Sequence, residues 1–577
     1  MINRDFGAIL GAFFFSLFAI QDLQAQNNQN QNKSNRRPNS FFYFGRAPQA
    51  PEPETLEVLS KNLGYESLDK AKEDYKIFSE RIRAGFARED WFQNCRSQYH
   101  ENLCGALENY LKPEKSIRNS RRRTPIFKVP LLPKNLGRLQ AEPFSSLHKR
   151  FPKMSFANLS KFAQKSLESD SCPRNFSLAL AVELENHADQ YGTWALIDKL
   201  YAHGHYCSRP SDDWNEMTNL KVAYTLISRN RFQDAIGFLQ NALKSETKRE
   251  DFRTLYWLYR SYKKLKSEKE AQNTLDELFK KYPISWYTIA ALHDEKRDPL
   301  ALIKKRPPIT DEYDCGDAKL NRHLNWLKFG LLVEEDPYDL IRYGEFIARR
   351  LSDTGKLAVA QNLARAFFKA KLYRLQILVL SQSLNQKPEL FNYEHLELLF
   401  PQPYFETMKQ HSGKIDTALL LGLARQESGF DLKARSAANA HGLLQLLPST
   451  AKTLARKTKK SDLYDYETNI QLGSTYVYKL VARFDGSVEK ALGSYNAGAT
   501  VMGHWENQFS WAKETQLFVD LIPYRETRDY IPSILRNGYW YHRLFPSLRE
   551  TWNDTMVTSP ALKALLESSP SKAASNP

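Results

Sequence analysis

A single glutamate follows a strongly apolar stretch of the sequence. Residues Ala418 to Ala424 are apolar or glycine, and Glu427 comes three residues later. Helical spacing places Glu427 on the same face as Leu420 and Leu423. A carboxyl group directed toward apolar surroundings is poorly solvated as an anion, so its pKa rises toward the range that a general acid needs. The pattern makes Glu427 a candidate acid catalyst; taken alone, it also fits a glutamate near a helix end that turns back to solvent.

Two amides and a tyrosine follow in an order suited to a sugar ligand. Gln445 lies in the middle of the apolar run 442–448, where its amide offers donors and an acceptor to hydroxyl and N-acetyl groups. Tyr495 supplies a flat apolar face for a sugar ring, and Asn496 places a second amide beside it. These residue types predict polysaccharide binding.

Short helices separated by glycine-rich turns are expected to carry these side chains. Asp416 is a suitable cap for the helix that ends near Glu427, and Gly429 terminates it. The spacing predicts a second helix at 467–484, stopping at 485–486, and a third that ends before Gly498. We therefore expect the polar residues to lie at the ends of helices.

The region 151–400 is expected to be almost entirely helical. The stretches 223–242 and 256–283 look like halves of helical-repeat units, which bury their apolar faces only by stacking. A purely structural array is the alternative for this region taken by itself. Pro401 and Pro403 interrupt the helices, so we expect a domain boundary there.

Four motifs in order resemble the soluble lytic transglycosylase family: 427–428, 442–445, 495–498 and 522–530. The resemblance covers about 401–545, is weaker in the helical region, for instance at 286–290, and does not extend before Phe151. It implies an all-α fold, with a helical-repeat superhelix followed by a lysozyme-like, mainly α-helical catalytic domain.

The resemblance also implies roles for individual residues. Glu427 takes the position of the catalytic carboxylate, and Tyr530 would orient that carboxyl group or the substrate. The residues expected to line the saccharide groove are Ser428, Gln445, Tyr495 and Asn496. Structural alternatives remain, because Ser428 can cap a helix, Tyr495 can belong to the core and Tyr530 can hydrogen-bond elsewhere. No metal or other cofactor is implied.

Two positions depart from the family pattern. Asn439 stands where the family usually has glycine, and asparagine is the next most tolerant residue at positive φ. Leu444 replaces the more usual methionine, a change that conserves volume. We therefore expect the loop around Gln445 to keep its shape.

The resemblance implies cleavage between N-acetylmuramic acid and N-acetylglucosamine with one carboxylate. Most glycoside hydrolases use two, and the motifs offer one candidate, Glu427; Asp431 has no matching role. Glu427 would protonate the glycosidic oxygen and then accept the proton of the muramyl 6-hydroxyl, which closes a 1,6-anhydro ring. The alternatives are a muramidase that uses water and a helical-repeat scaffold that binds glycan without cutting it.

The composition is that of a globular, basic protein. There are 82 Lys and Arg against 66 Asp and Glu, a net charge of +16, and the mean hydropathy of -0.57 argues against an integral membrane protein. The sequence lacks the motifs of nucleic-acid readers, so no nucleic-acid partner is expected. Peptidoglycan strands are the expected partner, with peripheral association to cell wall or membrane possible by charge; protein partners are not indicated.

The N-terminal residues suggest export. Residues 1–25 match a signal peptide, with an apolar run from Phe6 to Ile20 and a small-residue site at Ala25, so a periplasmic location is expected. An uncleaved anchor is the alternative. A Gln/Asn-rich tether at 26–50 follows, then an N-terminal helical region with a basic, proline-rich linker (51–150). Residues 546–577 are a C-terminal tail after the catalytic domain at 401–545.

Five cysteines form no C-x-x-C pair, which leaves a thioredoxin-like site or zinc ribbon unsupported. Export permits disulfides, and the first pairings to test are Cys95 with Cys104 and Cys172 with Cys207. Buried free thiols are the alternative. Either way at least one thiol remains, because the number is odd.

Overall fold

The structure, a computed structural model, describes much of the chain from residue 55 onward. The described residues are 55–84, 95, 100–110, 146–147, 150–168, 174–185, 196–197, 199–200, 216–244, 250–310, 312–334, 336–550 and 557–567. The predicted signal peptide, the tether, the linker around 116–133 and the proposed Cys172–Cys207 pair lie outside these ranges.

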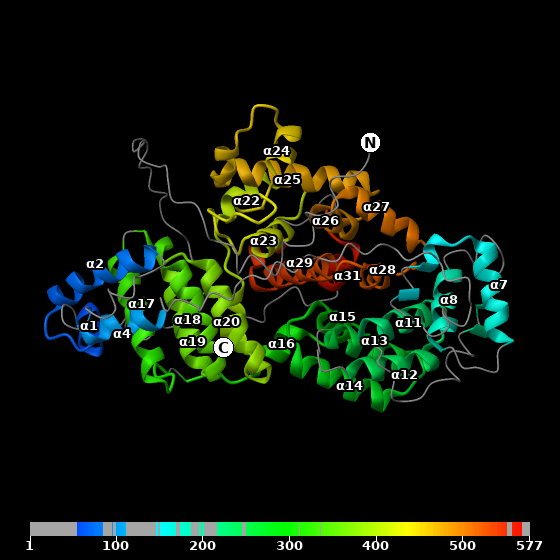
Figure 1. Cartoon of the computed structure of the whole chain (residues 1–577), viewed down its shortest axis with the longest axis horizontal. Helices are drawn as coiled ribbons and strands as arrows, with labels where there is room; N and C mark the ends of the chain where they lie inside the picture. Colours follow the sequence, from blue (N-terminus) through cyan, green and yellow to red (C-terminus); the bar gives the residue numbers. More distant parts are fainter. Residues whose placement is uncertain are drawn as a thin grey trace. The chain divides into compact units, whose positions relative to one another are not determined.

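The described residues form helices joined by turns, and strand-like pairing among them is limited to isolated bridges within 435–446 (Figure 1). The predicted all-α class is confirmed. In the described ranges, no helix is both long enough and apolar enough to cross a membrane.

The chain forms two compact units. The first draws on Met1–Arg118, Leu300–Tyr476 and Trp540–Met556, and the second on Asn119–Pro299, Val477–Tyr539 and Val557–Pro577. Residues 401–545, which we predicted to be one domain, contribute to both, and the predicted domain boundaries stay predictions. Helices α25 (Tyr466–Arg483) and α29 (Arg525–Leu544) each supply residues to both units.

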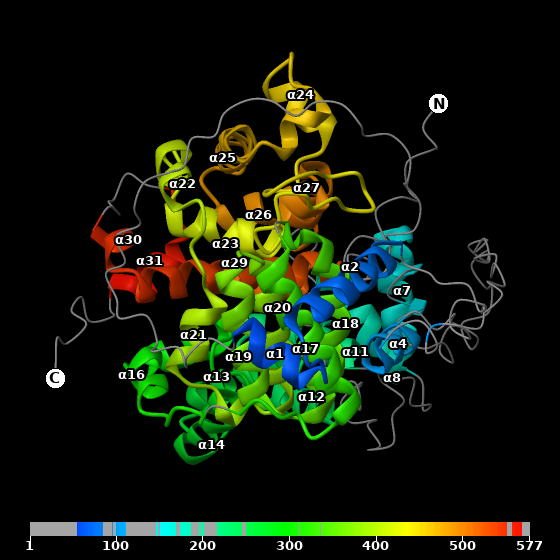
Figure 2. The ribbon, with the colours of Figure 1, turned by 90° about the vertical axis from the view of Figure 1, so that its left-hand side faces the viewer.

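The first unit consists of an N-terminal group, a set of repeat helices and the helices around Glu427. Its elements are α1 (Leu56–Asn62), α2 (Leu68–Ala84), α4 (Glu101–Tyr110), α17 (Ala318–Val333), η2 (Pro337–Leu340), α18 (Ile341–Thr354), α19 (Leu357–Lys369), α20 (Tyr373–Gln386), η3 (Pro388–Leu390), α21 (Tyr393–Leu399), α22 (Phe405–His411), α23 (Thr417–Glu427), α24 (Pro448–Leu454), η4 (Lys460–Tyr464) and α30 (Pro546–Glu550). Helices α18 and α19 both pack against α20 (Figures 1 and 2).

An aromatic cluster fixes the N-terminal helices to α17. Trp326 stacks on Phe78, with ring centroids 4.9 Å apart, and Tyr75 and Phe329 contact the same indole. At the rim, Ser79 and Arg83 of α2 bind the carboxylate of Glu334. Burying three large rings around one tryptophan supplies much of the apolar contact that α2 makes.

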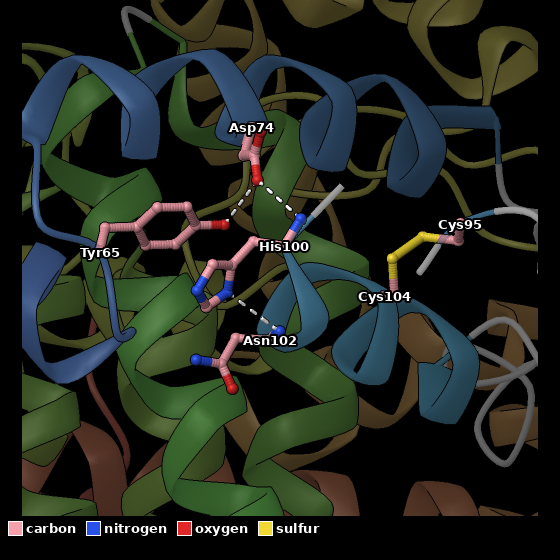
Figure 3. The surroundings of a disulfide bond; sticks show 6 residues. All are labelled: Tyr65, Asp74, Cys95, His100, Asn102 and Cys104. Carbon is pink, nitrogen blue, oxygen red and sulfur yellow. Dashed lines mark hydrogen bonds between the residues drawn. A yellow bond between two sulfur atoms is a disulfide. The ribbon is translucent and has the colours of Figure 1, made fainter. Parts of the chain in front are cut away.

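A disulfide lies beside this cluster. Cys95 and Cys104 are bonded, with Cα atoms 5.8 Å apart, which confirms the pairing favoured from the sequence (Figure 3). Nearby, the buried carboxylate of Asp74 accepts hydrogen bonds from the Tyr65 hydroxyl at 2.8 Å and from the His100 N–H at 3.3 Å. Within the described ranges, Cys315 is a buried free thiol.

The second unit begins with helix pairs and ends with the helices around Tyr495. Its elements are η1 (Phe151–Lys153), α7 (Phe156–Leu167), α8 (Arg174–Glu185), α11 (Glu216–Ser228), α12 (Phe232–Leu243), α13 (Asp251–Lys264), α14 (Glu268–Lys281), α15 (Trp286–Asp294), α26 (Val488–Ala497), α27 (Ala499–Gln508), α28 (Thr515–Leu521) and α31 (Pro560–Glu567); α16 (Pro299–Lys304) begins at its last residue before the first unit resumes.

Consecutive helices of this unit pack in series. Helix α11 packs on α12, α12 on α13, and α13 on both α14 and α15 (Figure 1). The predicted repeat halves at 223–242 and 256–283 are therefore helix pairs. Their apolar faces are covered by the next helix in the series, as expected for a stacked array.

Candidate active site

Glu427 lies at the end of helix α23. Asp416 caps its start by accepting a hydrogen bond from the Ala418 N–H at 3.0 Å, as predicted, and His542 of α29 contacts the other carboxylate oxygen at 2.8 Å. Residues 417–424 are buried, so the helix is held in the core. Glu427 is its last residue and is half-buried. The carboxyl group therefore stands at the edge of the core, less enclosed than the sequence pattern suggested.

Ser428 ends this helix. Its Oγ lies 2.8 Å from the carbonyl of Leu443 and 3.2 Å from that of Ala424, and it accepts from the Phe430 N–H at 3.1 Å. Gly429 and Phe430 then take positive φ values of 60° and 68° and turn the chain sharply. The structure thus places Ser428 as the helix cap, and its predicted contact with sugar stays a prediction.

Asp431 follows the turn and faces the repeat helices. Its Oδ1 accepts from the Lys433 N–H at 2.9 Å, and its Oδ2 lies 3.7 Å from Nη1 of Arg374 on α20. Burial raises the pKa of Asp431, against the opposing effects of the Lys433 N–H and of Arg374. These contacts fasten the segment after Glu427 to α20, which gives Asp431 a structural role.

The residues 436–446, here called the Gln445 loop, fold back on themselves. The His441 and Leu446 backbones exchange two hydrogen bonds of 3.0 and 3.1 Å. Asn439 has a φ of 65°, so asparagine adopts the positive φ expected where the family usually has glycine. At Gly442, with a φ of 74°, a Cβ atom would lie 2.0 Å from the carbonyl oxygen of Leu463, so no other residue fits without displacement.

A buried asparagine clamps this loop. Asn469 of α25 is fully buried and donates from Nδ2 to the carbonyls of His441, at 3.0 Å, and Leu463, at 2.8 Å. Its Oδ1 accepts from the Leu444 N–H at 2.7 Å. Leu444, which replaces the family's usual methionine, is itself buried against Gly473. The amide of Asn469 uses both donors and its acceptor to fix the loop that carries Gln445.

Gln445 is held in a defined orientation. Its φ is 47°, and its Nε2 donates to the carbonyls of Gly442, at 2.8 Å, and Ala434, at 3.1 Å. Both amide hydrogens are therefore used within the protein. Among the described residues, Oε1 has no hydrogen-bond partner, so Gln445 presents an acceptor and would bind a hydroxyl or N–H donor.

Tyr495 and Asn496 lie near the end of α26 in the second unit, and both are half-buried. Asn496 Nδ2 donates to Glu526 at 2.8 Å, and its Oδ1 accepts from the Thr527 hydroxyl at 2.6 Å. Burial raises the pKa of Glu526, and the hydrogen bond from Asn496 opposes that shift. Asn496 thus links α26 to the first turn of α29. Four residues beyond Glu526, Tyr530 is 1% exposed.

A buried charged cluster holds the start of α29 in place. Arg253 of α13 donates from Nη2 to the carbonyl of Arg528 at 2.8 Å, and its Nη1 lies 2.7 Å from Asp529 Oδ1. Asp520 of α28 accepts from Arg253 Nε at 3.0 Å and from Trp257 Nε1 at 2.7 Å. A buried charge is tolerable only when paired and hydrogen-bonded, so this cluster fixes α28 and α29 on a repeat helix.

The structure therefore groups the predicted site residues in two sets. Glu427, Ser428 and Gln445 belong to the first unit, whereas Tyr495, Asn496 and Tyr530 belong to the second. In the part of the chain that the structure describes, no group of three or more His, Cys, Asp or Glu side chains could hold a metal ion.

Comparison with known families shows what this part of the chain is similar to. Residues 405–518 match the family described as the transglycosylase SLT domain. We call these residues the SLT domain. Its limits include Glu427, Ser428, Gln445, Tyr495 and Asn496, whereas Tyr530 lies beyond the matched residues.

Relatives of the SLT domain agree with this assignment. Over 157 residues the chain is 31% identical to the soluble lytic murein transglycosylase of Escherichia coli, covering 26% of this chain and 24% of that protein. It is 35% identical over 117 residues to a membrane-bound lytic murein transglycosylase F of Haemophilus influenzae, 19% of this chain and 22% of the relative. The chain thus spans about a quarter of the length of these curated relatives.

Solved structures were also compared. An inactive mutant of the lytic transglycosylase Slt from Pseudomonas aeruginosa aligns with 85% of this chain and 81% of that chain, at 18% identity and a TM-score of 0.47.

Three residues in and around the SLT domain were not singled out from the sequence. Asn469 clamps the Gln445 loop, Glu526 binds Asn496, and Arg253 holds the start of α29. Asn469 lies inside a helix, a position that does not favour asparagine because its side chain competes for backbone hydrogen bonds. Its presence there was the available signal. Glu526 was inside a recognised motif. Arg253 lies 275 residues before its backbone partner Arg528, and no local pattern connects them.

Proposed function

We propose that the protein is a lytic transglycosylase that cleaves the bond between N-acetylmuramic acid and N-acetylglucosamine in peptidoglycan, with Glu427 as acid and then base. The observation that supports this most is the match of 405–518 to the SLT domain, with Glu427 half-buried at the end of α23. A carboxyl group at the edge of an apolar core can reach substrate while losing part of its hydration, which favours the protonated form.

The proposed reaction has two proton transfers. Glu427 gives its proton to the glycosidic oxygen as the bond from that oxygen to C1 of the muramyl residue breaks. The resulting Glu427 carboxylate then takes the proton of the muramyl 6-hydroxyl, whose oxygen bonds to C1 and closes the 1,6-anhydro ring. The glutamate ends as it began, and no water is consumed. The attacking group is already held in the substrate, an advantage worth up to ~7–11 kcal/mol in well-oriented cases.

The other predicted residues have supporting roles in this proposal. Gln445 offers Oε1 to a sugar hydroxyl or N-acetyl N–H, because its own hydrogens are bound to the loop backbone. Ser428 fixes the end of the catalytic helix to that loop. We assign Tyr495 and Asn496 to the saccharide groove and Tyr530 to orienting the carboxyl group or substrate. We assign the protein to the periplasm, after removal of residues 1–25, because peptidoglycan is the proposed substrate.

Purified protein on isolated sacculi tests the proposal. We expect muropeptides that weigh one water less than hydrolysed ones and that borohydride does not reduce. Glu427→Gln should abolish their release while leaving the circular dichroism spectrum unchanged, because the swap is nearly isosteric. Glu397→Gln, at another half-buried carboxylate whose pKa burial raises, on α21 outside the predicted site, is the matched control and should retain cleavage.

The alternatives give different results. Reducible muramic acid ends would show that water is the acceptor and that the protein is a muramidase. Binding of sacculi without any cleavage would support a scaffold. Loss of cleavage in Glu397→Gln to the level of Glu427→Gln would contradict a specific role for the Glu427 carboxylate.

A further inference from the structure

A run of cations follows the Gln445 loop. Between Leu446 and Asp462 the chain has five basic residues and no acidic one. These five, here called the basic segment, are Lys452, Arg456, Lys457, Lys459 and Lys460. All are exposed, and the chain between α24 and α25 projects beyond these helices (Figures 1 and 2).

The acidic residues that follow the basic segment in the sequence form no ion pair with it. Asp462 accepts from the Lys459 N–H and Asp465 from the Thr468 N–H, each at 2.9 Å, so both serve as backbone caps. Glu467 contacts His411 at 3.2 Å. Within the described residues, none of the five basic side chains forms an ion pair. Their positive field is therefore available to a ligand.

One end of the basic segment lies close to the Gln445 loop. Burial lowers the pKa of His441 most. The positive charges of Lys460 and Arg435, which act on the same imidazole, lower it further. Asn469 joins the carbonyls of His441 and Leu463, which lies three residues after Lys460. One end of the segment thus lies beside the loop that presents the Gln445 acceptor.

We propose that the basic segment binds the carboxylates of peptide stems on the glycan strand held by the Gln445 loop. This inference rests on the proposed function, because it takes peptidoglycan as the substrate. The sugars between stems offer hydroxyl and N-acetyl groups, whereas the stems carry free carboxylates, and five exposed cations complement these. Each such pair contributes little alone, but several act together on one strand.

An anionic membrane is a weaker match for the same charges. Surface helices that enter a membrane place tryptophan, phenylalanine or leucine side chains opposite their basic face. Within 452–460 the only large apolar residue is Leu454, and it is half-buried. The exposed apolar side chains that flank it in the sequence, Leu447 and Tyr464, lie outside it, so 452–460 offers charge without an apolar face of its own.

A charge-neutral variant tests the assignment. We compare wild type with a variant in which all five basic-segment residues are changed to glutamine. The matched control changes five exposed lysines of the repeat helices and their turns to glutamine: Lys264, Lys266, Lys269, Lys280 and Lys296. Both variants lose the same net charge and keep the core intact. Binding on ice is measured to intact sacculi, to sacculi whose free stem carboxylates have been converted to amides, and to vesicles of anionic phospholipid.

We expect the basic-segment variant to bind intact sacculi roughly tenfold more weakly than wild type and control, and all three to bind amidated sacculi alike. The difference should shrink at high salt, which screens exposed charges. An equal loss in the control, an unchanged preference of the basic-segment variant for intact over amidated sacculi, or a segment-dependent binding to vesicles alone would overturn the proposal. Cleavage by wild type is measured in the same preparation, so its absence would count against the proposed function and leave the binding comparison interpretable.

Discussion

The hydroxyl of Ser428 donates a hydrogen bond to the carbonyl oxygen of Leu443 over 2.8 Å and so joins the end of α23 to the Gln445 loop. Ser428 is 7% exposed and directly follows Glu427. The pair connects the residue that supplies the proton in our proposal with the loop that presents the sugar acceptor. The relative position of these two parts therefore depends on one buried hydroxyl.

Ser428→Ala should destabilise the protein and reduce cleavage together. Removing the hydroxyl leaves the buried Leu443 carbonyl without this donor, at a cost of about 1–3 kcal/mol in the free energy of unfolding. Urea unfolding and muropeptide release measure the two effects. Ser449→Ala, at an exposed position, is the control and should change neither. Full activity in Ser428→Ala would mean that the link to Leu443 does not position the site.

Asn469→Asp should disrupt the Gln445 loop without changing side-chain size. The carboxylate can still accept from the Leu444 N–H, but it cannot donate to the carbonyls of His441 and Leu463. Two buried carbonyls then face an oxygen, and a shift of the loop lowers kcat/KM by ~10-fold or more. Progress curves on soluble glycan fragments give the value. Gln471→Ala, exposed on the same helix, is the control, and equal rates in both variants would refute the clamp.

Much of the SLT domain could be predicted because its helix ends carry local signals. The cap at Asp416 and the turn at Gly429 follow from residue type, the positive φ of Asn439 follows from the family's usual glycine at that position, and all three are present. The helix predicted at 467–484 spans Tyr466–Arg483. Backbone conformation at such positions is decided by the residue itself.

The clamping contacts could not be predicted, because they join residues far apart in the chain. Asn469 reaches back 25 residues to Leu444, and Arg253 meets Arg528 across 275. Contacts between residues so far apart in the chain produce no periodic pattern in the sequence that could reveal them. Ser428 was the ambiguous position, because a short polar side chain at a helix end suits both a cap and a ligand. Its contacts with the carbonyls of Ala424 and Leu443 show that it caps the helix, and its contact with sugar stays a prediction.

Asp431→Asn should preserve the chemistry. The amide can still accept from the Lys433 N–H, and only the long contact of 3.7 Å to Arg374 is weakened. If Asp431 were a second catalytic carboxylate, its removal would cost roughly 10²–10⁴-fold in rate, as loss of a general acid or base does. We expect cleavage close to wild type, with 1,6-anhydro products unchanged by mass. A loss of that size in a variant with normal thermal stability would restore Asp431 as a catalyst.

Acid should destabilise the first unit through two buried histidines. His323 contacts the Tyr343 hydroxyl through Nδ1 at 2.7 Å, and burial, with the charges of Arg350 and Arg322, lowers its pKa to about 4. His395 accepts from the Asn392 N–H at 3.2 Å, and burial, with Arg365, lowers its pKa to about 3.

The sign of the effect follows from these shifts. Both histidines are neutral in the fold, whereas the unfolded chain takes up protons near pH 6.5, so stability is complete above that pH. As the pH falls below it, each histidine removes up to about 1.4 kcal/mol per pH unit, until about pH 4 for His323 and about pH 3 for His395. Urea unfolding at pH 7, 6 and 5, values chosen to span this range, measures the slope. His323→Gln should reduce it, since glutamine cannot take up the proton, while the exposed His504→Gln serves as control. A slope that is the same in wild type and His323→Gln would show that acid acts elsewhere in the molecule.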